Sequence, residues 1–327
     1  MAQQGDSAAD VAGRPRVVVF GPSPLLEVSI EPGTLGRASS IQVLAGGQAV
    51  WVARMAATMG SSVTMCGLVG GEVGGLLTPM LADEQFNLRL VATSATGCFI
   101  VDQRHEPATE VAADWAAPPA TADVAELVDV TVDAAAAADM LVICNPMPGE
   151  ALSLDTYTQL VAAATDRGTQ VLVDLSTPRL DAALRGGPAV VKLNDWELAE
   201  LVRAPVDEPS ARGTALRTVM DMGAEQVVET RGPATVVAVD ADEVIELSPP
   251  AVGDGRAAGC GDAMTGAMAA VLAEGAGLLE AVRLGMAAGA AHYRGRGESS
   301  RTAIESLARQ VVVRPVPHGQ GEVPQPG

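Results

Sequence analysis

The residues Gly259-Cys260-Gly261-Asp262 join a glycine-rich turn to a stretch that we expect to be a helix beginning near Asp262. Glycines allow a ligand to approach the backbone closely, and free N–H groups at a helix N-terminus form an anion site. A carboxylate placed there can accept a proton from a hydroxyl group. The alternative for this tetrapeptide alone is an ordinary aspartate that caps a helix.

A second polar group follows the apolar run Ala189–Val191. Asn194 and Glu197 are three residues apart, so an amide and a carboxylate lie on one face of a turn. Such side chains suit contacts to phosphate or to Mg²⁺, which keeps most of its waters. The alternative is a capping box, in which Asn194 caps a helix and Glu197 reaches back. Lys192, just before this pair, is the only lysine of the chain.

Two further turns carry glycines. Thr230-Arg231-Gly232-Pro233 separates two apolar runs, and Ala45-Gly46-Gly47 opens a helix that contains Trp51. Neither has the GxGxxG pattern. Because Leu193 follows the only lysine, a Walker GxxxxGK[ST] motif is also excluded, and a P-loop or dinucleotide site is disfavoured.

The elements around these residues alternate between short β-branched runs and longer Ala/Leu-rich amphipathic stretches. Strands are predicted at 17–20, 63–66, 140–144, 171–175, 190–193, 227–230 and 236–239. Helices are predicted at 49–59, 76–84, 156–165, 211–222, 263–274 and 279–293. This order predicts βαβ units and a mostly parallel sheet covered on both faces. Residues 27–44 and 96–113 have β-like composition without an adjacent helix and are expected to form a small second sheet.

Composition and charge limit the partners. The chain has 327 residues and a net charge of −19, which disfavours nucleic acid and anionic membranes. Its four cysteines form no CxxC pair, so a reduced compartment is expected. No secretory signal or membrane-spanning run is present, which favours a cytoplasmic protein. Residues 1–14 and 315–327 are predicted to be disordered tails around one domain at 15–314.

Taken together and in order, these segments resemble the PfkB carbohydrate kinases of the ribokinase type over about residues 16–313. The likeness is closest to the branch that contains fructose-1-phosphate kinase and tagatose-6-phosphate kinase. Six segments carry the likeness, in the family's order. The first three pairs are AGGQAVWVARMAATMG with AGGKGINVARVLxxLG, CGLVGGEVGGLL with LGxxGGxxGxxI, and NPMPGEALSLDTY with SLPPGVPxDxY. The last three are VKLNDWEL with KPNxxEL, VVETRG with the TxG loop, and AAGCGDAMTGAM with TGAGDSMVAG. The resemblance implies a Rossmann-like αβα sandwich with a small β lid, at 27–44 and 96–113, that often serves in dimerisation.

The resemblance also implies roles for individual residues in the transfer of phosphate from ATP with Mg²⁺. Asp262 matches the catalytic base, and Gly259, Cys260 and Gly261 match the anion hole. Asn194 and Glu197 match the pair that organises Mg²⁺ and phosphate, with Lys192 opening that motif, and Thr230 and Gly232 match nucleotide contacts. Arg256 is near enough in sequence to contact a phosphate, the alternative being a solvated loop arginine.

Departures from the family pattern lie mostly on the acceptor side. Leu25 and Leu26 stand near the place of an Asp, Gln48 replaces a Lys, and Trp51 replaces an Asn. Residues 95–98 lack an expected Arg, and Asn145 falls where a Ser is expected. The acceptor candidates are Gly46, Gly47, Trp51, Leu25 and Asn145.

These changes predict a small-molecule acceptor that is larger and less hydroxylated than a phosphosugar and stacks on Trp51. Three alternatives stay open. Trp51 could pack in the core, the chain could be a phosphosugar kinase with other contacts, or it could bind nucleotide without turnover.

Overall fold

The computed structural model describes residues 13–33, 39–84, 86–105, 108–147, 152–295 and 299–315. The predicted tails lie almost wholly outside the described residues, although Pro315 ends the last strand.

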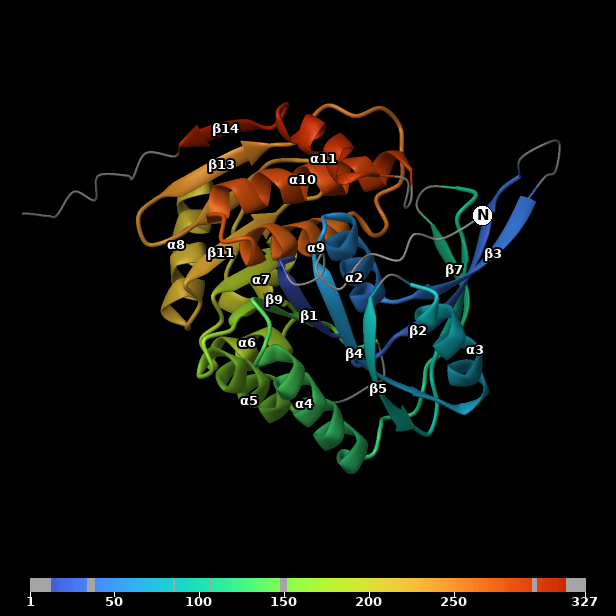
Figure 1. The fold of residues 1–327 in the computed structure, drawn as a ribbon. Coiled ribbons are helices and arrows are strands. Elements are labelled where there is room, and N and C mark those ends of the chain that lie inside the picture. The colour runs from blue at the N-terminus through green and yellow to red at the C-terminus, as the bar shows by residue number, and fades with distance from the viewer. Residues whose placement is uncertain are drawn as a thin grey trace, which may run out of the picture.

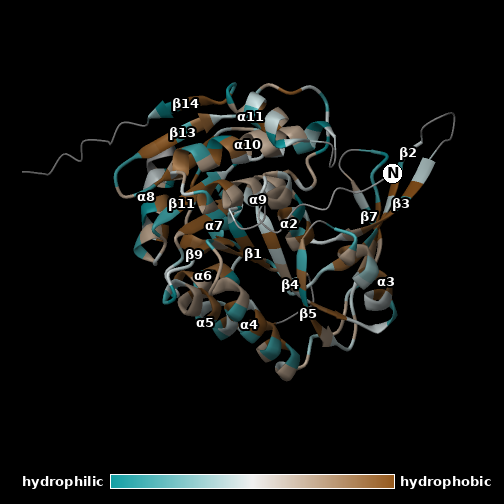
Figure 2. Ribbon diagram, viewed as in Figure 1, coloured by the Kyte–Doolittle hydropathy of each residue, from teal (hydrophilic) through white to brown (hydrophobic). Residues whose placement is uncertain are grey.

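A ten-stranded sheet runs through the centre of the protein in the order β14-β13-β12-β11-β10-β9-β8-β1-β4-β5 (Figure 1). The strands from β11 to β5 in this order are parallel: β11 (Gln226–Thr230), β10 (Val190–Asn194), β9 (Gln170–Asp174), β8 (Met140–Cys144), β1 (Arg16–Phe20), β4 (Ser62–Gly70) and β5 (Asn87–Thr93). At the other edge β12 (Val236–Val239), β13 (Val244–Ser248) and β14 (Val312–Pro315) continue the sheet antiparallel. The inner parallel strands β1 and β8 are nearly continuous apolar runs because both of their faces are covered, and brown segments run through the central sheet in Figure 2.

Helices pack on both faces of this sheet (Figure 1). One layer contains α2 (Gln48–Thr58), α3 (Gly71–Ala82), α9 (Cys260–Ala273), α10 (Leu278–Arg294) and α11 (Arg301–Ala308). The other contains α4 (Thr121–Ala135), α5 (Leu154–Thr165), α6 (Arg179–Leu184), α7 (Asp195–Val202) and α8 (Pro209–Asp221). The predicted αβα sandwich is therefore confirmed.

With few aromatic side chains available, α9 packs closely on its neighbours through glycine. A Cβ on Gly266 would lie 2.4 Å from the carbonyl oxygen of Val52 in α2, and one on Gly285 would lie 2.7 Å from Met268 in α9. Larger residues at either position would push these helices apart. This packing fixes the N-terminus of α9 against the sheet.

The smaller sheet has the order β3-β2-β6-β7. It consists of β2 (Leu25–Pro32), β3 (Ser39–Gly46), β6 (Cys98–Asp102) and β7 (Thr109–Asp114). In Figure 1 it extends to one side of the main sheet. Its strands arise from the two stretches that the sequence assigned to a second sheet. One face is polar and includes the buried Glu27 and Ser29, whereas the opposite face is apolar.

Most predicted elements are found within a few residues of their expected bounds. The sequence missed some elements, among them α4 and the strands β5, β13 and β14. Among the described residues, none of the helices combines the length and apolar character that crossing a bilayer requires.

Candidate active site

The polar residues singled out above meet at the carboxyl edge of the parallel strands. Asp174 ends β9, Asn194 ends β10 and Thr230 ends β11. The N-terminus of α9 lies over the same edge, since Thr265 of its first turns contacts Asp174. In open α/β sheets, this edge is where ligands bind.

Helix α9 begins two residues earlier than the sequence predicted. Gly259 is its N-cap with a φ of 82°, a conformation that favours glycine, and Cys260 is its first residue. Asp262 therefore lies in the first turn and does not cap the helix, so the simple capping interpretation is wrong. The N–H of Cys260 donates to the carbonyl of Ala257 (3.2 Å). The first-turn donors that remain for an anion are those of Gly261 and Asp262.

The carboxyl group of Asp262 has an unusual proton affinity. Its pKa is raised from 3.8 to about 7, mainly by burial and also by the charge of Asp174, while Lys192 opposes both effects. Cys144 of β8 also faces this group, and its own pKa is raised by burial, by Asp174 and by Asp262. A carboxyl group that titrates near neutrality is suited to take up a proton during turnover.

Lys192 is buried and forms an ion pair with Asp174, with 2.9 Å between Nζ and Oδ2. Burial alone would lower the pKa of Lys192, but the charge and hydrogen bond of Asp174, together with Asp262 and Glu197, raise it. A Cβ built on Gly261 would lie 3.8 Å from Nζ. The ammonium group is thus charged and adjacent to the first turn of α9.

On the acceptor side, the amide side chains of Gln48 and Asn145 form a connected set of hydrogen bonds with the backbone at the ends of two strands. Gln48 accepts from the Asn145 N–H (2.7 Å) and donates to the carbonyl oxygen of Asp174 (3.4 Å). Asn145 donates to the same oxygen (3.3 Å) and accepts from the N–H and hydroxyl of Ser176 (3.0 and 3.1 Å). The residues that replace the family's Lys and Ser therefore brace the ends of β8 and β9.

Asn194 and Glu197 form a capping box. The N–H of Glu197 donates to Asn194 Oδ1 and the N–H of Asn194 donates to Glu197 Oε2, both at 2.9 Å. Burial raises the pKa of Glu197. The capping interpretation is confirmed, and it uses the single side-chain oxygen of Asn194 and one of the two carboxylate oxygens of Glu197. In the neighbouring turn, the Thr230 hydroxyl donates to the Leu193 carbonyl (3.4 Å), and Gly232 has a φ of 54°.

Arg256 joins the loop before α9 to the small sheet. Its guanidinium pairs with Glu31 of β2 and donates to Gln103 Oε1 (3.1 Å), and its N–H donates to the Tyr293 carbonyl (2.9 Å). The Cys260 thiol donates to the Arg256 carbonyl (3.4 Å). Arg256 is thus engaged with protein groups, which differs from a solvated loop arginine.

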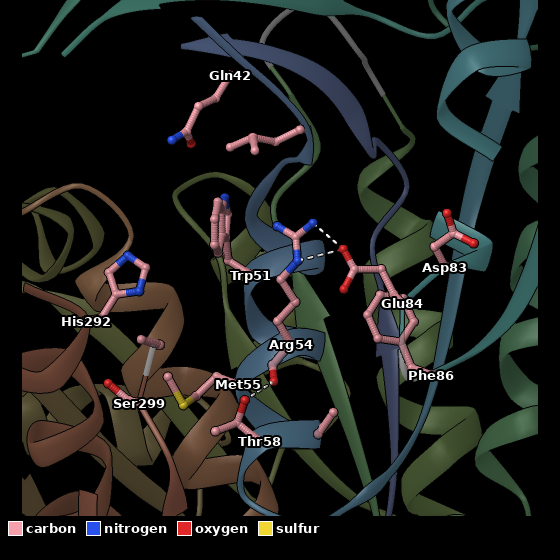
Figure 3. Close-up of a pocket in the computed structure, with 13 residues that line it drawn as sticks. Gln42, Trp51, Arg54, Met55, Thr58, Asp83, Glu84, Phe86, His292 and Ser299 are labelled. Atoms are coloured by element: carbon pink, nitrogen blue, oxygen red, sulfur yellow. Dashed lines mark hydrogen bonds and ion pairs between the residues drawn. The ribbon is translucent and has the colours of Figure 1, made fainter. Parts of the chain in front are cut away.

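Trp51 lines a pocket of about 580 Å³ between α2, β3, α10 and the turn after α3 (Figure 3). The Arg54 guanidinium lies 4.5 Å from the centre of its ring, and His292 packs against it edge-on at 5.6 Å. Arg54 in turn binds Glu84 through two N–H groups. Trp51 is therefore outside the core, and it is held from two sides. Ala263, the neighbour of Asp262, also lines this pocket.

The other acceptor candidates lie elsewhere. Leu25 is only 1% exposed, and a Cβ on Gly46 or Gly47 would meet it at 3.2 or 3.7 Å. These three residues pack against one another and are not among those that line the Trp51 pocket. The sequence analysis did not select Asp174 as a site residue. The signal that could have found it is a carboxylate at the end of a buried parallel strand.

Comparison with known proteins agrees with this geometry. Residues 16–303 match the model of the pfkB family carbohydrate kinases. The chain belongs to this family. It is 34% identical over 257 residues to the ATP-dependent 6-phosphofructokinase isozyme 2 of Escherichia coli, covering 77% of this chain and 82% of that protein. It is 30% identical over 299 residues to the 1-phosphofructokinase of Rhodobacter capsulatus, covering 86% and 91%.

Solved structures of PfkB kinases show the same fold. The Escherichia coli phosphofructokinase-2 in complex with substrates and products superposes with a TM-score of 0.77 at 29% identity, over 90% of this chain and 98% of that one. As a PfkB kinase, the protein is a phosphotransferase that acts on an alcohol group.

Proposed function

We propose that the protein transfers the γ-phosphoryl group of ATP to a hydroxyl group of a carbohydrate or carbohydrate-containing acceptor, with Asp262 as the general base. The observation that carries this proposal is the place of Asp262 in the first turn of α9, with a pKa of about 7. The acceptor hydroxyl gives its proton to Asp262 as its oxygen attacks phosphorus. The N–H groups of Gly261 and Asp262 stabilise the negative charge of the transferring group.

The nucleotide lies, in this proposal, along the ends of β10 and β11. Lys192, Asn194, Thr230 and Gly232 line that edge, and Arg256 holds the loop that leads to the anion hole. Among the described residues there is no cluster of three or more acidic, histidine or cysteine side chains that could bind a metal. Asn194 and Glu197 fit a Mg²⁺ that keeps its waters and is held mainly by phosphates, whose charge it would neutralise.

The acceptor of this enzyme, we infer, carries no phosphate group, although the names of the relatives suggest a fructose phosphate. Arg54 is paired with Glu84, and Arg256 with Glu31. To bind either of these two arginines, a phosphorylated acceptor would have to displace its carboxylate. Phosphate recognition depends on charge-assisted hydrogen bonds worth roughly 1.5–3 kcal/mol each.

Incubation with Mg·ATP and a panel of sugars, sugar phosphates and nucleosides tests the proposal. We expect a mass gain of one phosphoryl group on an acceptor without phosphate. Fructose 6-phosphate or fructose 1-phosphate as the best acceptor would overturn the acceptor class and leave the kinase intact. ATP binding without transfer to any acceptor would favour a nucleotide-binding protein without turnover.

Glu197→Gln separates a Mg²⁺ role from capping. A glutamine oxygen can still accept the Asn194 N–H, so the start of α7 should persist and the melting temperature should stay within a few degrees. The Mg²⁺ concentration needed for half-maximal rate should rise by about tenfold or more. Glu200→Gln, on an exposed position of the same helix, is the matched control. A much lower melting temperature with unchanged kinetics would show that Glu197 only caps the helix.

The apolar face of the small sheet is the proposed contact with a second copy of the chain. It consists of Val28, Ile30, Ile41, Val43 and Ile100, which the strand register places on one side. Ile41 is 70% and Val43 is 51% exposed.

We further propose a cytoplasmic location, because all four cysteines are free thiols.

Val43→Glu should convert a dimer into a monomer, because the new charge would be desolvated in the contact. The mass in solution, measured by light scattering, reports this change. Gln42→Glu adds the same charge to the opposite face of β3 and should leave the dimer intact. A monomeric wild-type protein at high concentration would contradict the proposal.

A further inference from the structure

Asp174 connects the two sides of the candidate active site. Its carboxylate oxygen Oδ2 accepts hydrogen bonds from Lys192 Nζ (2.9 Å) and from the hydroxyl of Thr265 in α9 (2.5 Å). Its carbonyl oxygen accepts from Gln48 and Asn145. Asp174 is buried, and its backbone thus braces the acceptor side while its carboxylate faces the anion hole.

The carboxylate of Asp174 is unsuited to act as the base itself. Oδ2 already accepts hydrogen bonds from an ammonium group and a hydroxyl group, so it is engaged with the protein. Asp262 lies close enough for the charge of Asp174 to raise its proton affinity. Two neighbouring carboxyl groups with one lysine therefore differ in role, since Asp174 binds the lysine and Asp262 is able to bind a proton.

Thr265 ties this arrangement to the helix that carries Asp262. Its side chain is fully buried, and its hydroxyl lies 3.0 Å from the Gly261 carbonyl as well as 2.5 Å from Asp174. The position of the first turn of α9 relative to β9 and β10 consequently depends on Asp174.

We propose that Asp174 is a positioning residue for phosphoryl transfer, which holds the Lys192 ammonium beside the first turn of α9 and holds that turn over the sheet through Thr265. This inference rests on the proposed kinase function. In this proposal Lys192 is held where its ammonium group can contact the phosphates of the nucleotide. The charge of Asp174 also sets the electrostatic environment of Asp262.

Asp174→Asn tests the carboxylate alone, because the backbone contacts with Gln48 and Asn145 remain. Without the charge of Asp174, and with Lys192 no longer neutralised, Asp262 should ionise more readily. The acid limb of the rate profile should move to lower pH by about one unit or more. The groups that face Asp262, namely Asp174, Lys192 and Cys144, lie on different strands, and only the first is changed.

Nucleotide affinity gives a readout that does not need turnover. Binding of Mg·ATP, measured by calorimetry, should weaken by about tenfold in Asp174→Asn, as expected when a charged phosphate contact is misplaced. The acceptor KM should change less than threefold, and kcat should fall by about 10- to 100-fold. Thr265→Val, which keeps the ion pair, should lower kcat with little effect on ATP affinity.

Several outcomes distinguish the possibilities. An unshifted acid limb with unchanged ATP affinity overturns the proposal. A fall in kcat well above 100-fold, together with complete loss of the acid limb, would make Asp174 the base and would also overturn the proposal. If Asp174→Asn fails to fold, the double variant Asp174→Asn/Lys192→Met removes both buried charges, and ATP affinity as strong as that of the wild type would then refute the role of the pair. A wild-type protein that binds ATP but phosphorylates no acceptor contradicts the kinase function, while the ATP-affinity comparison still decides the role of Asp174.

Discussion

Asp262→Asn should lower turnover by about 10²- to 10⁴-fold, the usual contribution of a positioned general base. The asparagine side chain has nearly the same size but cannot take up the proton of the acceptor hydroxyl. ATP affinity should stay within a few-fold, because Lys192 and the N–H groups of α9 are unchanged. Turnover and nucleotide binding are to be measured on the same preparation, with the exposed Asp221→Asn as a control for a neutralised carboxylate.

The pH dependence of the wild-type enzyme follows from the same residue. Since the pKa of Asp262 is about 7, the rate should fall roughly tenfold per unit at pH values below 7. The Asp262→Asn variant should lose this acid limb. Turnover close to that of the wild type would remove Asp262 from the role of base.

The contribution of Asp262 to the free energy of unfolding should change with pH in the opposite sense to the rate, since it is largest in acid. The folded state binds the proton of Asp262 more tightly than the unfolded state, whose pKa is near 3.8, so the stabilisation is complete in acid and is lost as the pH rises from about 4 to 7. The melting temperature of Asp262→Asn should therefore exceed that of the wild type at pH 8, and the difference should vanish near pH 4. A constant difference across this range would contradict a raised pKa.

The central sheet could be predicted from the sequence because its strands are buried on both faces. Continuous β-branched runs such as Val17–Phe20 and Met140–Cys144 have few alternatives at that length. Helix α4 was missed because its local sequence favours a strand and only its packing makes it a helix. Its sequence TADVAELVDVTVDAA contains Val and Thr, which favour strands locally, and only packing of residues such as Leu127 on the sheet makes the segment helical.

The catalytic motif could be predicted because its residues are neighbours in the chain. The contacts that support it could not be predicted, because they join residues that are far apart in the sequence. Asp174 is 18 residues from Lys192 and 91 residues from Thr265, and its place at the end of a strand does not reveal either partner. Arg256 finds its partner Glu31 at a separation of 225 residues. Such pairs depend on which strands and loops are adjacent in the fold, and a single sequence does not contain that information.

Trp51 shows the same limit on the acceptor side. Its position in the helix after Gly46-Gly47 was predicted, but its contacts with Arg54 and His292 change what it can do. A ring that is held on both sides forms a wall of the pocket, and its faces are less available for stacking than the sequence suggested. The prediction that the acceptor stacks on Trp51 therefore needs displacement of Arg54 or His292.

Gly259→Ala should lower turnover by about 10²-fold or more, which is the usual effect of displacing the donors of an anion hole. The φ of 82° at Gly259 is unfavourable for alanine by about 1–2 kcal/mol. In addition, the new Cβ would lie 2.7 Å from His292 Nε2. His292 is buried, packs against Trp51 and interacts with the Ala258 carbonyl at 3.2 Å, so it cannot easily move away. The turn would have to open, and Gly261 and Asp262 would move with it.

Gly275→Ala is the matched control, because it separates backbone strain from the collision. Gly275 follows α9 at its other end, with a φ of 84° and no atom within 4 Å of a built Cβ. Gly275→Ala should lose only the stability that backbone strain costs, about 1–2 kcal/mol, and keep its turnover. The double variant Gly259→Ala/His292→Ala removes the collision and should recover part of the lost rate, as measured in the same phosphoryl-transfer assay. Equal losses of turnover in Gly259→Ala and Gly275→Ala would show that strain alone, and not the geometry of the first turn of α9, limits the reaction.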